Sequence, residues 1–381
     1  MRVMIAGGGT GGHVYPGIAM YNALKRREAK VEALFVGARA GVENRIFSDL
    51  GLPNVLLPGR GVRGKGIVAK LTSPFVFVTG IVRGIREVRV FRPDVVIGTG
   101  GYASVAAVVA AAVCGRKRVL QEQNSVPGMA NRWLSRFADL VLLSYEESKS
   151  YIRSGVRTAV VGNPIRVNLH ADRAAGFAFF RLDAAFPTVL VCGGSRGARS
   201  LNRAAAAAIP RILEKRRVQF VFLAGDLDFE KTKHELERFG SDVRVFPFLE
   251  EMHHAYSVAD VAVSRAGASA VFELAAFGVP TVFVPYPYAA DDHQRKNVAR
   301  LADLGAAIVV GDSEISGEKL QSLIDGLLDD GERRGRMTRE MKNWAKPDAD
   351  VRAAEAIAEL VSGRGRGSPA RGPSDAGRSV A

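Results

Sequence analysis

The stretch Gly7-Gly8-Gly9-Thr10-Gly11-Gly12-His13 decides the fold, because it follows an apolar run at residues 2–6 and opens a helical stretch. Its glycines at 7, 9 and 12 satisfy the pattern G-x-G-x-x-G, in which backbone N–H groups approach a phosphate at a helix N-terminus. The acid that a dinucleotide site needs at the end of the second strand is missing, since that strand closes with Gly37-Ala38-Arg39. The loop by itself leaves two interpretations open, a phosphate site and a tight structural turn.

Outward from this loop, short β-branched runs alternate with longer helical stretches, which predicts an α/β protein with parallel sheets and crossover helices. In the first half we expect strands at 2–6, 31–36, 95–98, 119–121 and 140–143, and helices at 17–27, 104–114 and 130–137. The pattern then restarts, with strands expected at 188–192, 219–223, 243–246, 261–264, 281–284 and 307–310. Two sheets fit this repetition better than one.

The domain organisation follows from length and from one break. The 381 residues are too many for one ordinary domain, and Gly162-Asn163-Pro164 interrupts regular structure between the two sets of strands. We therefore expect domains at 1–163 and 164–345 and a last helix within 346–361. Residues 362–381 are Gly, Ser, Pro and Arg with little to bury, so we expect a disordered basic tail.

Glycine-rich turns recur in both halves. Cys192-Gly193-Gly194-Ser195-Arg196-Gly197-Ala198 follows a strand of the second half, and Gly98-Thr99-Gly100-Gly101-Tyr102 follows a strand of the first. We expect their N–H donors to point into a shared cleft. Two facing sites indicate a diphosphate donor on one half and a second anionic substrate on the other.

Three further motifs carry predictions. Residues 59–66 nearly match a P-loop, but Gly66 stands where Ser or Thr should bind magnesium, so NTPase chemistry is rejected. A helix starting near Ser269 would place Glu273 one turn in, suited to ribose hydroxyls, with a carboxylate that only stabilises the helix start as the alternative. Asp291-Asp292-His293-Gln294 is interpreted as a loop with sugar-hydroxyl contacts, since adjacent residues seldom converge on one metal ion. We expect neither metal nor cofactor.

The chain has 53 basic and 39 acidic residues and therefore a net charge of +14. Such an excess of positive charge indicates an anionic partner. Neither zinc-ligand spacing nor an aromatic RNA-binding signature accompanies the charge, so nucleic acid ranks below phosphorylated metabolites and anionic lipid. The apolar runs at 105–114 and 73–82 are shorter than the ~20 residues of a spanning helix. The start of the chain carries no signal peptide pattern. We expect a cytoplasmic protein with two reduced cysteines, Cys114 and Cys192.

Six stretches closely resemble the MurG family, the peptidoglycan N-acetylglucosaminyltransferases that convert lipid I to lipid II. They are GGGTGGHVYPGIA (7–19), IGTGGYAS (97–104), EQNSVPGMANRWLSRFAD (122–139), GNPIR (162–166), GGSRGARSLN (193–202), and SRAGASAVFE through DDHQRKN (264–297). The resemblance covers nearly all of residues 2–360 in order. It implies a GT-B architecture, with two doubly wound Rossmann-like domains facing across a cleft and a C-terminal helix that returns to the first domain.

The resemblance also implies site residues. UDP-N-acetylglucosamine would lie on the second half, with Ser195 at the diphosphate, the backbone near Leu249 at uracil and Glu273 at the ribose. The full set assigned to the donor is Thr10, Gly11, Gly12, Asn124, Arg166, Ser195, Leu249, Ala268, Ser269, Glu273 and Gln294. Gly9 and Tyr102 are assigned to the lipid I acceptor. The chain departs from the family at Arg196, where Gln is common, at Ala270, where Thr is usual, and at Gln121, which replaces a frequent His.

The implied reaction is inverting, with the muramyl C4 hydroxyl attacking the anomeric carbon as UDP leaves. His13 is the candidate base, because the positive end of a helix dipole disfavours protonation of its imidazole. The alternative is a structural histidine that hydrogen-bonds the glycine loop.

A lipid-linked acceptor requires docking on a membrane. Apolar residues at Ile67, Leu71, Phe75 and Phe77 stand within a basic rim, which suits an anionic leaflet. The rim comprises Arg60, Arg63, Lys65, Lys70, Arg83, Arg86 and Arg89. A buried helix with a solvated basic face is the alternative. We expect a peripheral protein at the cytoplasmic face of the inner membrane, with other cell-wall synthesis proteins as candidate partners.

Three competing functions are kept. A diacylglycerol glycosyltransferase would share the architecture and the second-half motifs but lack the GTGGY and EQN signatures. An NAD(P)-dependent oxidoreductase would use residues 7–12 but leave the second half's loops unexplained. The third is a non-catalytic nucleotide-sugar binding protein.

Overall fold

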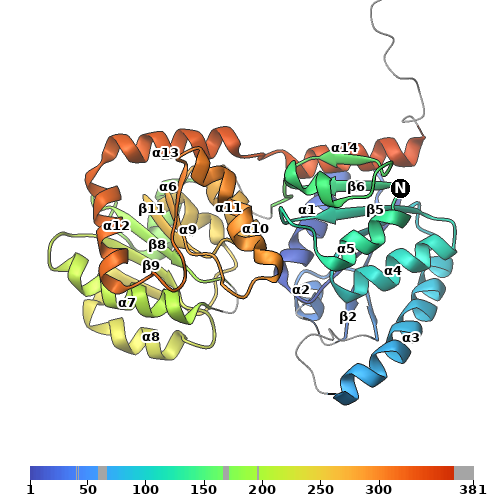
Figure 1. Ribbon diagram of the computed structural model, residues 1–381, viewed down its shortest axis with the longest axis horizontal. Coiled ribbons are helices and arrows are strands. Elements are labelled where there is room, and N and C mark those ends of the chain that lie inside the picture. Colours follow the sequence, from blue (N-terminus) through green and yellow to red (C-terminus); the bar gives the residue numbers. More distant parts are fainter. Residues whose placement is uncertain (40, 42, 59–66, 166–170, 195–196, 364–381) are drawn as a thin grey trace, which may run out of the picture.

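The computed structural model describes residues 1–39, 41, 43–58, 67–165, 171–194 and 197–363, without the side chains of residues 67–76. Two halves lie side by side, each built on its own parallel sheet (Figure 1). The predicted tail lies outside the described residues from 364 on.

The first sheet has seven strands in the order β3-β2-β1-β4-β5-β6-β7. Their bounds are β1 (Arg2–Gly7), β2 (Glu32–Ala38), β3 (Asn54–Leu57), β4 (Val95–Gly100), β5 (Lys117–Glu122), β6 (Leu140–Leu143) and β7 (Thr158–Val160). The five predicted strands are confirmed, and β3 and β7 were missed. Both are short strands at the edges of the sheet, where each pairs on one side only and carries little hydrophobic pattern.

The second sheet has six strands in the order β10-β9-β8-β11-β12-β13. All six were predicted: β8 (Thr188–Cys192), β9 (Gln219–Leu223), β10 (Val243–Phe246), β11 (Val261–Ser264), β12 (Thr281–Phe283) and β13 (Ala307–Val309). In both sheets the first strand in the chain lies between its second and fourth strands. The chain leaves the first and the fourth strand of each sheet, β1 and β4 or β8 and β11, in opposite directions. This reversal opens a crevice at the carboxyl ends of the two strands.

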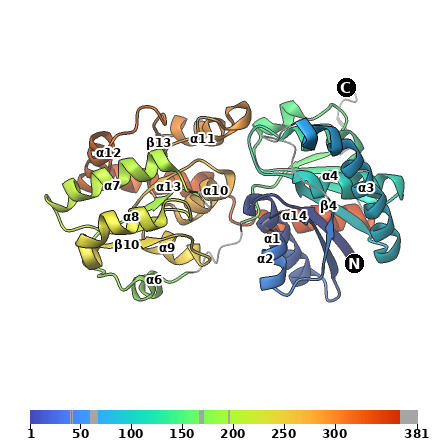
Figure 2. The same ribbon diagram turned by 90° about the horizontal axis from the view of Figure 1, so that it is seen from below.

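Helices cover both faces of each sheet (Figures 1 and 2). In the first half these are α1 (Gly11–Arg27), α2 (Glu43–Asp49), α3 (Ile67–Phe91), α4 (Gly101–Val113) and α5 (Met129–Leu134). The helices expected at 17 and 104 in fact begin at Gly11 and Gly101, because helical turns start directly on the glycines after β1 and β4. The helix expected at 130–137 is divided into α5 and a 3₁₀ turn, Ser135–Phe137.

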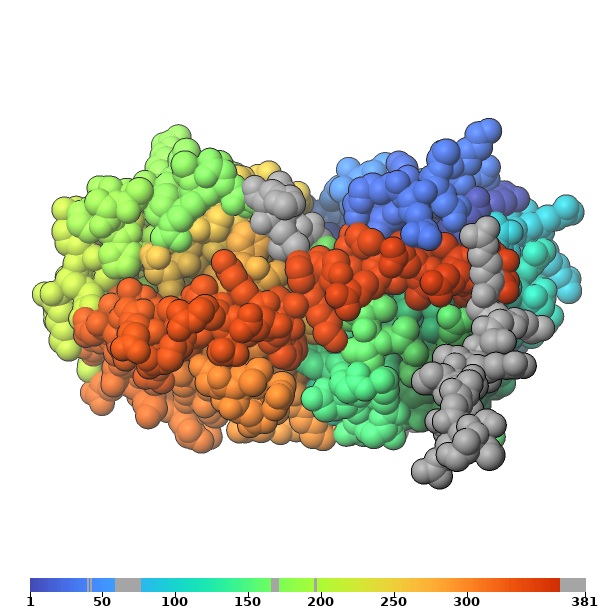
Figure 3. All heavy atoms as spheres, turned by 90° about the horizontal axis from the view of Figure 1, so that it is seen from above, coloured from blue at the N-terminus to red at the C-terminus, as the bar shows by residue number. Residues whose placement is uncertain are grey.

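The remaining helices follow later in the chain. They are α6 (Arg173–Phe180), α7 (Arg199–Leu213), α8 (Phe229–Leu236), α9 (Met252–Val258), α10 (Ala268–Phe277), α11 (His293–Asp303), α12 (Gly317–Asp329), α13 (Gly331–Trp344) and α14 (Ala349–Ser362). Of these, α14 lies on the first half, where Ala353, Ala354 and Ile357 enter its core. An ion pair of 2.5 Å joins Asp350 to Arg26 of α1. Figure 3 shows these last helices running over both halves.

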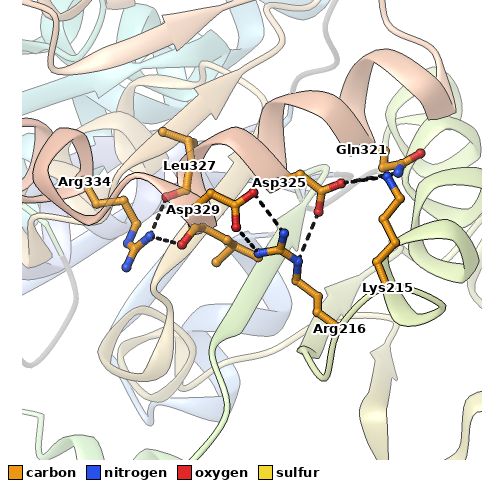
Figure 4. Close-up of polar contacts among 8 residues, drawn as sticks. Lys215, Arg216, Gln321, Asp325, Leu327, Asp329 and Arg334 are labelled. Atoms are coloured by element: carbon orange, nitrogen blue, oxygen red, sulfur yellow. Dashed lines mark hydrogen bonds and ion pairs between the residues drawn. The ribbon is translucent and has the colours of Figure 1, made fainter.

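An arginine that follows α7 holds α12 (Figure 4). The guanidinium of Arg216 donates to both carboxylate oxygens of Asp329, at 2.7 and 3.0 Å, and lies 3.5 Å from Asp325. This bidentate bond lowers the pKa of the Asp329 carboxyl. Arg334 then donates to the carbonyls of Leu327 and Leu328, so the end of α12 is tied to α7 and to α13.

Within the described part of the chain, no helix is both long enough and apolar enough to cross a membrane.

Candidate active site

The loops that matter lie at the carboxyl ends of β1 and β4 in one half and of β8 and β11 in the other. Parallel strands end at the same edge of a sheet, so each half gathers its loops at one edge. The two edges face each other through α1 and α10, whose starts lie on opposing sides (Figure 2). A Cβ placed on Gly12 would lie 3.9 Å from Ser269 Oγ, so the two helix N-termini meet across the junction.

Asn297 of α11 connects the two halves by hydrogen bonds. This fully buried side chain accepts from the backbone N–H of Ser125 at 2.9 Å and from its hydroxyl at 3.1 Å. Its amide group donates to Asn124 Oδ1 at 3.2 Å and to the Ala266 carbonyl at 3.1 Å. One side chain therefore fixes the loop after β5 against the loop after β11.

Glu122 shapes the loop that presents Asn124. Its buried carboxylate accepts from the Asn124 backbone N–H at 2.9 Å, from the Gly128 N–H at 3.1 Å and from the Asn131 side chain at 2.8 Å. Asn124, expected to reach the donor sugar, is thus held at the junction between Glu122 and Asn297.

The glycines of the first half serve mainly close approach between two loops. A Cβ on Gly7 would lie 2.0 Å from Thr99 Oγ1, and one on Gly101 would lie 2.3 Å from the Gly8 carbonyl oxygen. The amide of Gly8 donates to the Gly100 carbonyl at 3.3 Å. We expected the amides of these loops to point into the cleft, and for Gly8 this is wrong, because the loops bond to each other.

A buried acid that sequence reasoning missed lies behind this loop. The carboxylate of Glu43, at the start of α2, is fully buried and accepts from the N–H of Gly9 at 2.9 Å and of Ala38 at 2.8 Å. An acid is therefore present near the end of the second strand, but it belongs to the next helix, α2. Its carboxylate accepts hydrogen bonds from the backbone and not from a ligand. Glycines at 37 and 41 that leave room for one acid were the available signal. The Gly9 amide, assigned to the acceptor, is occupied by Glu43.

His13 lies in the first turn of α1. Its Nδ1 is 2.9 Å from the Gly8 carbonyl oxygen, and only a protonated Nδ1 can donate to that acceptor. The ring packs on Gly100, where an added Cβ would lie 3.1 Å from Nε2. The expected alternative, a histidine bonded to the glycine loop, is therefore present in the geometry. It is compatible with a catalytic role, because a neutral ring held in this way keeps its lone pair on Nε2. Thr10 is the N-cap residue of α1, and Gly11 and Gly12 are its first residues.

In the second half, α10 begins as predicted. Gly267 is the N-cap residue, Ala268 and Ser269 open the helix, and Glu273 follows one turn later. The Glu273 carboxylate is 5 % exposed and accepts a hydrogen bond of 2.7 Å from the Tyr256 hydroxyl on α9.

Two more predicted donor residues lie on neighbouring elements of this half. Gln294 of α11 accepts from the Tyr286 N–H at 2.9 Å, and Leu249 is buried just before α9.

Several predicted residues cannot be placed. Arg166 and Ser195, together with Arg196, lie outside the described residues, as do the side chains of Ile67, Leu71 and Phe75.

Phe77 is described, and it is not a free apolar wedge. Its ring packs edge-on against Tyr102, with centroids 5.9 Å apart. Burial raises the pKa of the Tyr102 hydroxyl.

One group among the described side chains has metal-ligand spacing. The ligand atoms of Glu251, His253 and His254 lie within 4.8 Å of one another. The His254 ring, however, is stacked on Phe179 at 4.6 Å and 17°. This stack packs the His254 ring of α9 against α6, and we assign no metal to the group.

Comparisons with known proteins show the family to which the chain belongs. The model of the glycosyltransferase family 28 N-terminal domain matches residues 3–143, and that of the family's C-terminal domain matches residues 188–353. The chain belongs to glycosyltransferase family 28.

Relatives in this family share nearly the full chain. A UDP-N-acetylglucosamine--N-acetylmuramyl-(pentapeptide) pyrophosphoryl-undecaprenol N-acetylglucosamine transferase of Chlorobaculum tepidum is 40 % identical over 94 % of this chain and 99 % of its own. A transferase of the same name from Lactiplantibacillus plantarum is 36 % identical over 92 % and 96 %. The crystal structure of Acinetobacter baumannii MurG matches with a TM-score of 0.73 and 29 % identity, over 94 % of this chain and 99 % of that one.

These findings confirm the predicted family resemblance, the GT-B fold and the enzyme class, an N-acetylglucosaminyltransferase. The NAD(P)-dependent oxidoreductase and the diacylglycerol glycosyltransferase find no support in them.

Proposed function

We propose that this family 28 enzyme transfers N-acetylglucosamine from UDP-N-acetylglucosamine to the C4 hydroxyl of lipid I, undecaprenyl-pyrophosphoryl-MurNAc-pentapeptide, giving lipid II with inversion. The observation that carries the proposal is the meeting of α1 and α10, with Gly12 opposite Ser269 and His13 in the next position along α1. Two helix N-termini with opposed positive ends suit two diphosphates brought together for one reaction.

The donor lies on residues 164–345 in this proposal. The amides at Ala268 and Ser269 face its diphosphate, because the start of α10 is a site for negative charge. Glu273 accepts from the ribose and Gln294 binds sugar hydroxyls, and both side chains are already held by neighbours on the same half. Arg166, Ser195 and the backbone at Leu249 complete the donor set, and Asn124 reaches the sugar from residues 1–163.

The acceptor lies on residues 1–163, near Thr10, Gly11, Gly12 and Tyr102. His13 Nε2 takes the proton of the C4 hydroxyl as its oxygen bonds to the anomeric carbon and the bond from that carbon to the diphosphate breaks. UDP leaves with the bonding electron pair, and the helix N-termini stabilise its charge. The hydrogen bond of Nδ1 to Gly8 supports this role, since it leaves Nε2 as the basic atom.

Docking on an anionic membrane, at the cytoplasmic face of the inner membrane, involves α3 in this proposal, with Ile67, Leu71 and Phe75 as the apolar contacts. Support comes from the described part of α3, where Val78 is 56 % and Val82 61 % exposed. Sedimentation with anionic vesicles tests this point: binding that weakens with salt is expected, and indifference to anionic lipid would contradict it.

A coupled assay of UDP release tests the function. With a lipid I analogue present, UDP should appear quickly from UDP-N-acetylglucosamine and far more slowly from other UDP-sugars. Release that does not depend on the acceptor would contradict transfer to lipid I.

A further inference from the structure

The carboxylate of Glu43 is the most enclosed acid near the reaction centre, and the mechanism above does not use it. Both of its oxygens accept from backbone amides, those of Gly9 and Ala38. A Cβ at Gly8 would lie 2.1 Å from Glu43 Oε1, one at Gly41 2.0 Å from Oε2 and one at Gly37 2.6 Å from Cγ. Three glycines therefore leave the space in which this one side chain is buried.

The contact with Gly9 has a consequence for His13, because both act on a single peptide group. The N–H of Gly9 and the C=O of Gly8 belong to the same amide. Its N–H donates to Glu43 at 2.9 Å, and its C=O lies 2.9 Å from His13 Nδ1. Hydrogen bonds in such a chain polarise one another, so a carboxylate at the N–H end makes the C=O end a stronger acceptor.

We propose that Glu43 is a positioning residue for His13 and acts through the Gly8–Gly9 peptide. It orients that peptide so that its carbonyl holds the imidazole with the proton on Nδ1 and the lone pair on Nε2. The logic is that of a base oriented by a third group, with one amide inserted between carboxylate and imidazole. The inference rests on the proposed function for its catalytic part, since it takes His13 as the base.

A merely structural role for Glu43 is the alternative. The bond to Ala38 closes the turn after β2, and a side chain that did only this would support the loop without affecting the protonation site of His13. The two roles differ in one observable, the imidazole tautomer.

The test uses the full chain without substrates, labelled with ¹⁵N at its histidines and compared with Glu43→Gln. Gln keeps the shape, but its NH₂ cannot accept a hydrogen bond, so one of the two amides loses its partner. We expect His13 to be protonated on Nδ1 in the unchanged protein and to be a mixture of both tautomers in Glu43→Gln. We also expect kcat to fall about tenfold with little change in the KM for the donor.

Asp49→Asn is the matched control, because Asp49 lies on the same helix, is exposed and pairs only with Arg45 at 3.4 Å in the described structure. It should leave both tautomer and kcat unchanged. Thermal unfolding followed by circular dichroism reports whether each variant is folded.

An unchanged tautomer in folded Glu43→Gln would overturn the proposal. So would an Nε2-protonated His13 in the unchanged protein, a result that needs no variant to fold. A normal kcat in His13→Asn would instead contradict the base assignment, and the tautomer measurement would still decide whether Glu43 acts on His13.

Discussion

Each half places a buried glutamate beside its glycine-rich edge, and the two glutamates bind different kinds of group. Glu43 is fully buried and accepts from two backbone amides, whereas Glu273 is 5 % exposed and accepts from the hydroxyl of Tyr256. The six strands of the second sheet follow the same order as the first six strands of the first sheet, so topology does not cause the difference. In the first half the acid stabilises the loop that carries a base, and in the second it lies on a helix face that suits a ligand.

The same comparison explains why the first loop fits a dinucleotide pattern without a dinucleotide site. A dinucleotide-binding domain directs its acid at a ribose. Here the acid turns under the loop and accepts from the Gly9 amide, so this amide is not available to a cofactor pyrophosphate.

The largest expected effect is in the first half. His13→Asn should lower kcat about 10²- to 10⁴-fold, because it removes the general base. The KM for UDP-N-acetylglucosamine should change little, since the donor lies on the other half. Steady-state kinetics with a lipid I analogue measures both constants, and a kcat near that of the unchanged protein would contradict the assignment.

The matching change in the second half should act on binding. Glu273→Gln should raise the KM for the donor about 10- to 100-fold, because a hydrogen bond to a charged group contributes about 1.5–3 kcal/mol. Tyr256→Phe, which keeps the carboxylate, should have a smaller effect in the same direction. A loss in kcat alone would place Glu273 with His13 and remove the contrast between the halves.

The junction between the halves should be sensitive to Asn297→Ala. This change leaves buried groups of Ser125 and Ala266 without the bonds they make now, at a cost of about 1–3 kcal/mol each when unsatisfied. Thermal unfolding should begin at a lower temperature, and turnover should fall as the halves lose their relative position. An unchanged Tm would show that the junction is held by other contacts.

Much of the fold and part of the candidate site could be predicted from the sequence. The elements that were missed have physical reasons for it. Central strands such as β8 and β11 are buried on both faces and read as apolar runs, whereas β3 and β7 lie at edges and do not. The place of Ser269 and Glu273 at the start of a helix was predicted correctly, because a glycine turn after a strand marks that helix start. Glu43 was missed because its partners are backbone amides at Gly9 and Ala38, and backbone contacts leave no pairing pattern in side chains.

A smaller effect is expected where Tyr145 of the first half packs on the second half. The Tyr145 ring packs on Phe272 at 5.2 Å and Trp344 at 5.9 Å, and its buried hydroxyl has no hydrogen-bond partner among the described residues. Burial raises the pKa of this hydroxyl well above its usual value, so it stays protonated. Tyr145→Phe should increase stability by about 1 kcal/mol in urea unfolding. A clear decrease would mean that the hydroxyl finds a partner in solution.

The smallest effect concerns pH and Asp329, whose pKa is lowered from 3.8 by the Arg216 bond. A carboxyl with a lowered folded pKa contributes stability above its unfolded pKa, and this is lost as pH falls through the folded value. Asp329→Asn should therefore be slightly less stable than the unchanged protein at pH 7, with the difference closing below pH 3.8. Urea midpoints over this range measure it, and a difference independent of pH would exclude the ionised pair as its cause.

The most direct test of the whole account is the product itself. The protein should convert UDP-N-acetylglucosamine and a lipid I analogue into a disaccharide whose β-1,4 linkage is visible by NMR, and a 4-deoxy analogue should give none. Release of UDP without that disaccharide would contradict transfer to lipid I, and an α-linked product would contradict the inverting mechanism.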